Sequence, residues 1–225
     1  MVVAGHSRLI RPRAFVIALL GAESTGKTTL AGALQVALST ASCRIAVVGE
    51  YLREFCNAHG RTPRIDEQPH IAAEQTRRIE AACAIHDIVI ADTTALMIAV
   101  YSHHVFGDTR LYADAQTAHA RCDLTLLTAL DLAWRADGMQ RDGPQVREPV
   151  DALVRAALGR AGASYSVVAG RGAARVQAAL ACVQRAMQPP PTADVDADAD
   201  GSRWHWHCER CGDAACERRT MLPRA

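Results

Sequence analysis

The sequence has almost no lysine, few aromatic residues and nearly no net charge. Its 225 residues include 24 arginines but one lysine, and aromatic residues make up 4%. A net charge of +1 argues against a protein built mainly to bind nucleic acid, and no apolar run reaches the ~18 residues that a membrane span needs. The N-terminus also lacks the apolar core of a signal peptide. We therefore expect a cytoplasmic protein with no nucleic-acid or membrane partner, and its oligomeric state stays open.

Short apolar runs alternate with helical patterns along most of the chain. The run 14–20 is apolar throughout, as is typical of a strand that is buried on both faces. The alternation predicts an α/β fold in which a five-stranded parallel sheet carries helices on both faces. The expected strands are 14–20, 44–49, 87–91, 123–127 and 165–169. The expected helices are 27–39, one that begins near 51, 66–85, 94–106, 110–121, 146–161 and 171–187.

The first strand is followed by a sequence that fits G-x-x-x-x-G-K-[ST], the phosphate-binding loop of P-loop NTPases. Its glycines allow the backbone N–H groups to turn inward, and the helix that follows points its positive dipole end at the same place. Lys27, the only lysine, would reach the β- and γ-phosphates of ATP, and the Thr28 hydroxyl would hold Mg²⁺. The alternative is a glycine-rich turn that matches by accident. The nucleotide-binding residues that we expect are Gly21, Ala22, Glu23, Ser24, Thr25, Gly26, Lys27, Thr28 and Thr29.

Two carboxylates follow strands whose ends should face this loop. Asp92 ends the third strand and would hold Mg²⁺ together with Thr28, although it could instead be a plain helix cap. Glu50 ends the second strand and could accept the proton of an attacking hydroxyl, or could simply be a charge at a helix start. Glu50 is the first choice for the general base, and Asp92 is the alternative. A substrate would enter near Tyr51 and Arg53, although Arg53 could equally pair with Glu50 or Glu54.

The short chain and its single lysine narrow the class of P-loop protein. The N-K-x-D motif of GTPases needs a second lysine, and the chain has no room for motor or helicase subdomains. A loop rich in arginine and glycine at 133–144 would suit a lid that closes on phosphate, with Arg135, Arg141 and Arg147 as its cations. A solvated surface loop is the alternative. These features favour a small-molecule kinase.

Several motifs resemble one family of kinases. The sequence contains GAESTGKTTL, GEYLREF, EQTRRIE, VIADTT and LDLAWRADGMQRDGPQVRE. Together they resemble the ribosylnicotinamide kinase domain of NadR-type proteins, over about 15–185. The resemblance implies a fold like nucleoside and nucleotide kinases, the cofactors ATP and Mg²⁺, and transfer of the γ-phosphoryl group to the 5′-hydroxyl of nicotinamide riboside. The chain departs from the family's D-G-x-R loop, because Arg141 stands one place later than expected.

The composition changes sharply after Met187. We expect a kinase domain over 1–187, a disordered linker over 188–203 rich in proline and aspartate, and a short tail over 204–225. The tail could bind one Zn²⁺ because it carries a C-x-x-C pair, or it could be disordered with exposed thiols. The candidate zinc ligands are His205, His207, Cys208, Cys211 and Cys216.

Three functions remain open at this point. The first is a kinase for nicotinamide riboside, and the second is a kinase for another nucleoside. The third is a nucleotide-binding switch without substantial turnover, which would signal to a partner by lid closure.

Overall fold

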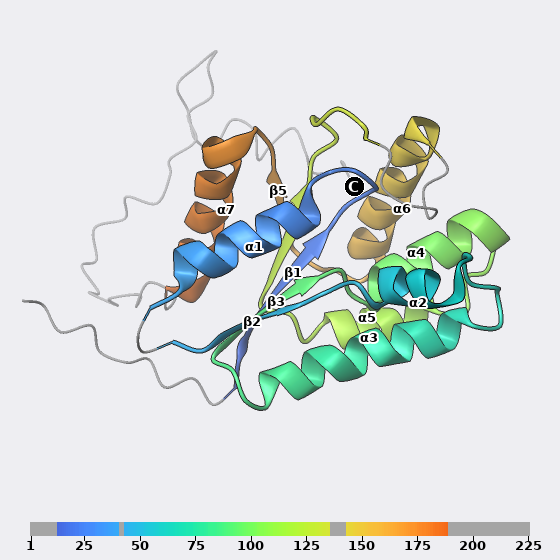
Figure 1. Cartoon of the computed structure of the whole chain (residues 1–225), viewed down its shortest axis with the longest axis horizontal. Coiled ribbons are helices and arrows are strands. Elements are labelled where there is room, and N and C mark those ends of the chain that lie inside the picture. The colour runs from blue at the N-terminus through green and yellow to red at the C-terminus, as the bar shows by residue number, and fades with distance from the viewer. Residues whose placement is uncertain (1–12, 41–42, 136–142, 189–225) are drawn as a thin grey trace, which may run out of the picture. The chain divides into compact units, whose positions relative to one another are not determined.

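A computed structural model describes residues 13–40, 43–135 and 143–188, in which five strands form one parallel sheet (Figure 1). The order of the strands is β2-β3-β1-β4-β5, so β1 lies at the centre. The predicted fold class and all five expected strands are confirmed. Pro189 and everything after it lie outside the described residues, so the linker and the tail stay predictions. The strands are β1 (Phe15–Leu20), β2 (Ile45–Val48), β3 (Ile88–Asp92), β4 (Leu124–Thr128) and β5 (Ser166–Val168).

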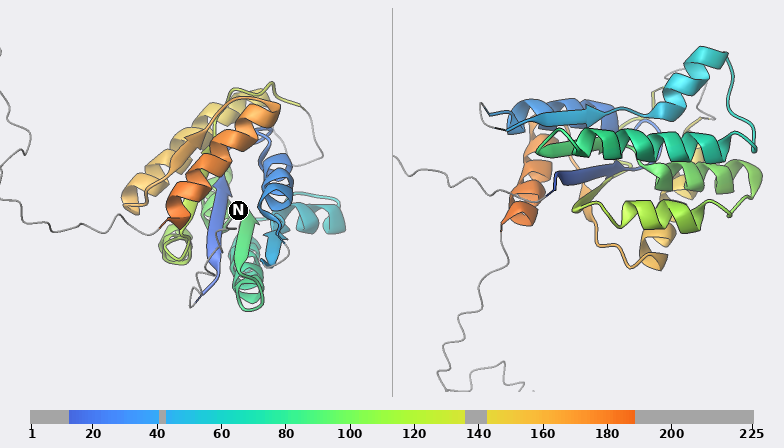
Figure 2. Two further views of the ribbon diagram at one scale, coloured as in Figure 1. Left: turned by 90° about the vertical axis from the view of Figure 1, so that its left-hand side faces the viewer. Right: turned by 90° about the horizontal axis from the view of Figure 1, so that it is seen from below.

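The helices cover the sheet on both faces, as Figure 1 and Figure 2 show. On one face α1 and α7 pack on the inward side chains of the strands, and on the other face α3 to α6 form a larger layer to which α2 is added. The helices that the structure describes are α1 (Lys27–Leu38), α2 (Tyr51–His59), α3 (Gln68–Cys83), α4 (Ala95–Phe106), α5 (Tyr112–His119), α6 (Arg147–Arg160) and α7 (Gly172–Met187), with a 3₁₀ turn η1 (Pro144–Val146) before α6.

The central strand is buried on both faces, which explains its unbroken apolar sequence. Phe15, Ile17 and Leu19 pack under α1 and α7, whereas Leu20 belongs to the core on the opposite face. All six residues of β1 are buried. Burial of each large side chain contributes about 1.5–3 kcal/mol of transfer free energy. This strand therefore gives the loop that follows it a rigid base.

The register brings polar residues to the carboxyl end of the sheet. Leu19 of β1 lies opposite Asp92 of β3, and Leu20 lies opposite Leu127 of β4. The loop after β1 therefore emerges between the end of β3 and the end of β4, where parallel sheets place their ligands. None of the described helices is both long and apolar enough to span a membrane.

Candidate active site

The loop between β1 and α1 has a backbone that requires glycine at two positions. Gly21 has φ 147° and Gly26 has φ 79°, and between them Ser24 also has a positive φ of 55°. A Cβ atom at Gly21 would lie 2.1 Å from Thr128 Oγ1, so this position has no room for a side chain. The loop is thus held in a curled conformation that L-residues rarely adopt.

The loop is held in place from two other elements. The Thr128 hydroxyl of β4 donates to Thr25 Oγ1 (2.7 Å), and the Thr25 hydroxyl donates to the Ala22 carbonyl (2.8 Å). From α7, Arg175 donates to the Thr25 carbonyl (2.8 Å) and to Asp131 (2.8 Å). Arg175 is only 5% exposed. A buried guanidinium fixed by a carboxylate therefore holds the loop's backbone, a role that the sequence analysis did not assign.

The geometry of the loop fits a bound polyphosphate. Gly26 caps α1 through its backbone, and the first turn of α1 carries no acidic residue and no side-chain cap within the described chain. Its N–H groups therefore remain donors for an anion. Lys27 Nζ donates to the carbonyls of Gly21 (2.8 Å) and Ala22 (2.9 Å), which keeps the ammonium against the loop.

The predicted metal-binding pair is brought together. The Thr28 hydroxyl donates to Asp92 Oδ2 (2.6 Å), and Asp92 is buried at the end of β3. A hydroxyl and a carboxylate are hard oxygen ligands of the kind that Mg²⁺ prefers beside phosphates. The residues present therefore fit Mg²⁺.

A cavity of about 680 Å³ lies over the loop and is called here the phosphate-loop cavity. Ser24 and Arg135 close one side, because the Arg135 N–H donates to Ser24 Oγ (2.8 Å). Arg171, at the start of α7, adds a cation that the sequence analysis did not select. The cavity is lined by Ser24, Thr25, Gly26, Lys27, Thr28, Thr29, Arg53, Leu132, Ala133, Arg135 and Arg171.

A neighbouring cavity of about 460 Å³, called here the Glu50 cavity, holds the other predicted carboxylate. It shares Lys27 and Arg53 with the phosphate-loop cavity, so the two spaces meet at these cations. Arg53 Nη2 lies 3.6 Å from Glu50 Oε2, and Glu50 is one of the two ion-pair partners that the sequence left open for Arg53. The Glu50 cavity is lined by Glu23, Lys27, Glu50, Leu52, Arg53, Cys56, Thr62, Pro63, Arg64, Ile65, Gln68, Tyr101, Val105 and Phe106.

Glu50 is not a cap for its helix. It stands at the N-cap position of α2, yet its side chain makes no capping hydrogen bond within the part of the chain that the structure describes. Cys56 of the same helix also lines the Glu50 cavity, and burial, followed by the nearby Glu50 charge, raises the pKa of its thiol to about 11. That thiol stays protonated near neutral pH, so the cavity offers Glu50 rather than Cys56 as a proton acceptor.

A buried glutamine joins the two strand ends that carry the carboxylates. Gln75 of α3 is fully buried; its Oε1 accepts from the Tyr51 N–H (2.8 Å), and its Nε2 lies 3.2 Å from both the Gly49 and the Thr93 carbonyls. Thr93 has a positive φ of 87°, a strained conformation for a residue with a branched side chain. Gln75 therefore fixes the backbone that flanks Glu50 on one side and Asp92 on the other.

The remaining predicted site residues are placed less directly. The Tyr51 ring packs under Arg78, whose guanidinium carbon lies 4.3 Å from the ring centroid, and Tyr51 is not among the residues that line either cavity. Arg147 is buried and donates to the Leu132 carbonyl (2.9 Å), so it supports a residue of the phosphate-loop cavity without lining that cavity. A direct contact of Arg147 with phosphate stays a prediction.

Other predicted residues lie outside the described part of the chain. These are Arg141 of the lid and the five candidate zinc ligands of the tail. Within 13–40, 43–135 and 143–188, no group of three His, Cys, Asp or Glu side chains could hold a metal ion. The zinc site stays a prediction, and the zinc content of the purified chain with and without 204–225 tests it.

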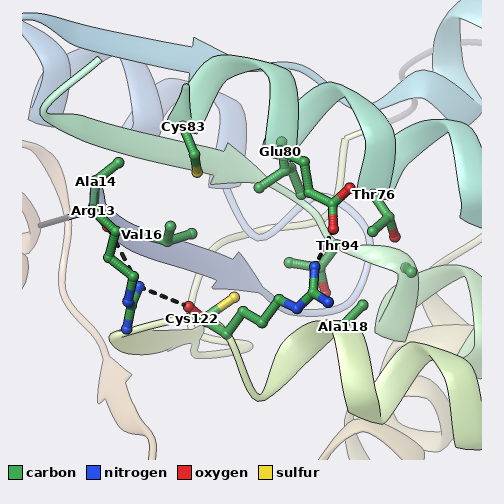
Figure 3. Close-up of a pocket in the computed structure, with 12 residues that line it drawn as sticks. Arg13, Ala14, Val16, Thr76, Glu80, Cys83, Thr94, Ala118 and Cys122 are labelled. Carbon is green, nitrogen blue, oxygen red and sulfur yellow. Dashed lines mark hydrogen bonds and ion pairs between the residues drawn. The ribbon is translucent and has the colours of Figure 1, made fainter. Parts of the chain in front are cut away.

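A third cavity, of about 220 Å³, is separate from the phosphate loop (Figure 3). Cys83 of α3 and Cys122 line it, and an ion pair between Glu80 and Arg121 joins α3 to the segment after α5. Burial raises the pKa of the Cys122 thiol to about 12, with smaller contributions from nearby charges. Burial also raises the pKa of the Cys83 thiol, so both thiols are held protonated and neither is an activated nucleophile.

Several known structures have a similar fold. One is a NadR protein in complex with NR, with a TM-score of 0.65 and 20% identity over 79% of this chain and 52% of that chain. A NadR protein in complex with NAD and AMP-PNP matches with a TM-score of 0.60 and 21% identity, over 76% of this chain and 49% of that one. This chain thus spans about half the length of the NadR chains.

Smaller kinases match over nearly their whole length. Thymidylate kinase from Ehrlichia chaffeensis has a TM-score of 0.55 and 14% identity, over 77% of this chain and 99% of that chain. Deoxyadenosine kinase from M. mycoides has a TM-score of 0.51 and 14% identity, over 76% of this chain and 98% of that chain. At these identities the likeness shows that the fold is shared.

The sequence comparisons give one family. A comparison with curated proteins found no match. The family described as AAA domain (AAA_28) matches residues 16–175, most of the chain and the whole of both cavities. The chain therefore belongs to this AAA domain family.

Proposed function

We propose that the protein is an ATP-dependent kinase that phosphorylates the 5′-hydroxyl of nicotinamide riboside and forms nicotinamide mononucleotide. One observation carries the proposal: the phosphate-loop cavity and the Glu50 cavity meet at Lys27 and Arg53. A donor bound in the first and an acceptor bound in the second would face each other across two cations. Such an arrangement suits transfer of a phosphoryl group, in which positioning and charge stabilisation do most of the catalytic work.

The phosphate-loop cavity would bind ATP. The N–H groups at the start of α1 would take the β- and γ-phosphates, and Lys27 would leave the carbonyls of Gly21 and Ala22 to follow the transferred group. Thr28 and Asp92 would hold Mg²⁺, which neutralises charge on the phosphates. Arg141 and Arg147 would stabilise the charge that develops on the departing ADP.

The Glu50 cavity would bind the riboside. The bond from the 5′-oxygen to the γ-phosphorus forms as the bond from that phosphorus to the bridging oxygen breaks, and the hydroxyl proton passes to Glu50. Asp92 is the alternative base. The contacts favour Glu50, because Asp92 already accepts the Thr28 hydroxyl whereas Glu50 lines the acceptor's cavity. Arg53 would contact the acceptor or the transferring group from its place between the two cavities.

Two lines of support point to nicotinamide riboside as the acceptor. The motifs of the sequence resemble those of NadR-type ribosylnicotinamide kinases, and a NadR protein in complex with NR shares the fold. The Glu50 cavity has room for a nucleoside-sized molecule.

The test is a product assay. Purified protein with ATP and Mg²⁺ should convert nicotinamide riboside to nicotinamide mononucleotide, with one ADP formed for each product. Adenosine, cytidine, uridine and thymidine serve as competing acceptors. Turnover of one of these nucleosides alone would show that it, and not nicotinamide riboside, is the acceptor. Tight ATP binding without any product would favour the regulatory switch.

A further inference from the structure

Gln68, the first residue of α3, is a buried polar residue whose side-chain carbonyl oxygen has no partner in the described part of the chain. It is 4% exposed, it lines the Glu50 cavity, and its Oε1 has no hydrogen-bond partner among the described residues. Leaving a buried polar group unpaired is unfavourable, so such a group is either a defect or a place for a ligand. Its position is fixed, because Pro69 follows it and Glu67 before it is the N-cap of α3.

The walls beside Gln68 expose apolar side chains. Ile65 is 39% exposed, Val105 is 55% exposed and Phe106 is 38% exposed. These are three of the six large hydrophobic residues that are exposed in the described part of the chain, and all three line the Glu50 cavity. Apolar surface gathered around one unpaired amide is suited to a flat ring that carries a single polar substituent.

Three of the five charged residues that line the same cavity, Lys27, Glu50 and Arg53, mark the part of it that adjoins the phosphate-loop cavity. Lys27 and Arg53 also line the phosphate-loop cavity, and Glu50 pairs with Arg53. The reacting hydroxyl would therefore lie near Glu50 and these cations. The ring of the acceptor would then be left to Gln68 and the apolar walls.

We propose that Gln68 is a specificity-determining residue that hydrogen-bonds the carboxamide on the acceptor's ring. This inference rests on the proposed function, since it assigns a role within the acceptor's cavity. Two carboxamides complement each other, because each has an N–H donor and a carbonyl acceptor. A ring without that substituent leaves Gln68 unpaired and gains nothing from it.

The experiment compares two ribosides in three proteins. Binding of nicotinamide riboside and of the pyridine riboside that lacks the carboxamide is measured by calorimetry with a non-hydrolysable ATP analogue, and KM is measured with ATP. The wild type should bind nicotinamide riboside about tenfold more tightly than the other riboside, which is a typical contribution of one buried hydrogen bond. Gln68→Leu should remove this preference by weakening nicotinamide riboside alone. Gln184→Leu, at an exposed position of α7, should keep it.

A stability measurement separates recognition from a structural role. Gln68 Oε1 makes no hydrogen bond within the described protein, so Gln68→Leu should leave the ligand-free protein as stable as the wild type or more stable. Destabilisation, or an unchanged preference between the two ribosides in Gln68→Leu, would overturn the inference while the proposed function stands. Failure of the wild type to bind either riboside would overturn both.

Discussion

The two cavities that meet at Lys27 and Arg53 are held in different ways. The phosphate-loop cavity is built on backbone. Its loop is curled, with Gly21 at φ 147°, and is held by Arg175 at the Thr25 carbonyl and by Thr128 at the Thr25 hydroxyl. The Glu50 cavity is built on side chains from α2, from the turn before α3 and from α4. The phosphate-loop cavity thus has a fixed shape for a ligand group that does not vary, whereas substitutions can reshape the Glu50 cavity.

This difference has a functional consequence. Every acceptor would receive its phosphoryl group from the same ATP, so the phosphate-loop cavity needs no variation. The ring of an acceptor would instead be recognised by groups such as Gln68 and Phe106, which line the Glu50 cavity and not the phosphate-loop cavity. Substitutions should therefore separate into those that change ATP use and those that change acceptor use.

The largest effect is expected at the two carboxylates. Glu50→Gln should lower kcat by roughly 10²–10⁴-fold and leave ATP affinity almost intact, because it removes the proton acceptor from the acceptor's side. Asp92→Asn should instead raise the Mg²⁺ concentration that half-maximal activity requires, since Asp92 is bonded to Thr28. Titration of Mg²⁺ against kcat in both variants measures this. If both variants lost metal dependence equally, the roles of general base and metal ligand would be assigned wrongly between Glu50 and Asp92.

The next largest effect on activity is expected at Lys27, because it lines both cavities. Lys27→Ala should cost at least ~100-fold in kcat/KM by removing the charge that follows the transferring group. Lys27→Arg should fail as well, because a planar guanidinium cannot replace an ammonium that fits between the Gly21 and Ala22 carbonyls. Steady-state kinetics with ATP checks both. Normal turnover in either variant would mean that the phosphate loop has been misinterpreted.

The sequence predicted the backbone-built part of the site better than the part built from side chains. All five strands were confirmed, because apolar runs of strand length are a local signal, and the loop at 21–28 was found because its glycines and lysine have fixed spacing. The contact of Thr28 with Asp92 was expected from topology, since the ends of adjacent parallel strands meet.

Residues that act through long-range contacts were missed. Arg175 lies 150 positions from Thr25, and nothing local to α7 marks it as a support of the loop. Gln75 stands inside the EQTRRIE motif, so a signal existed, but its bonds to Tyr51 and Thr93 depend on how α3 packs. Gln68 could be found only from the structure, because its buried Oε1 has no hydrogen-bond partner among the described residues.

Substitution of Arg175 tests whether the phosphate-binding loop depends on its support from α7. Arg175→Met should raise KM for ATP by about tenfold and lower the free energy of unfolding by about 1–3 kcal/mol, because the Thr25 carbonyl and Asp131 lose a buried donor. KM for the acceptor should not change. Arg185→Met, at an exposed position of the same helix, is the control and should alter neither quantity. A larger effect on acceptor KM than on ATP KM would break the division between the cavities.

The smallest effect is expected at Glu67, on the acceptor's side. Its carboxylate accepts from Arg61 (2.7 and 2.6 Å) and from the Arg64 N–H (2.7 Å), which holds the turn that carries Ile65 into the Glu50 cavity. The Arg61 guanidinium, and then the Arg64 N–H, lower the pKa of Glu67 to about 2. A carboxyl with a lowered pKa stabilises the fold above its ordinary pKa, and this contribution is lost as the pH falls through about 2.

Glu67→Gln should therefore raise acceptor KM by about threefold between pH 5 and 8 and leave ATP KM unchanged. The effect should be small because the ion pair between Glu67 and Arg61 is partly exposed to solvent. The measurement is acceptor KM at several pH values, with Asp66→Asn as the matched control, because Asp66 faces Arg64 at 3.5 Å from an exposed position. The effect should not vary with pH in this range, since Glu67 stays charged throughout. A pH-dependent effect, or a rise in ATP KM alone, would mean that this turn supports the phosphate loop and that the two cavities are less separate than their contacts indicate.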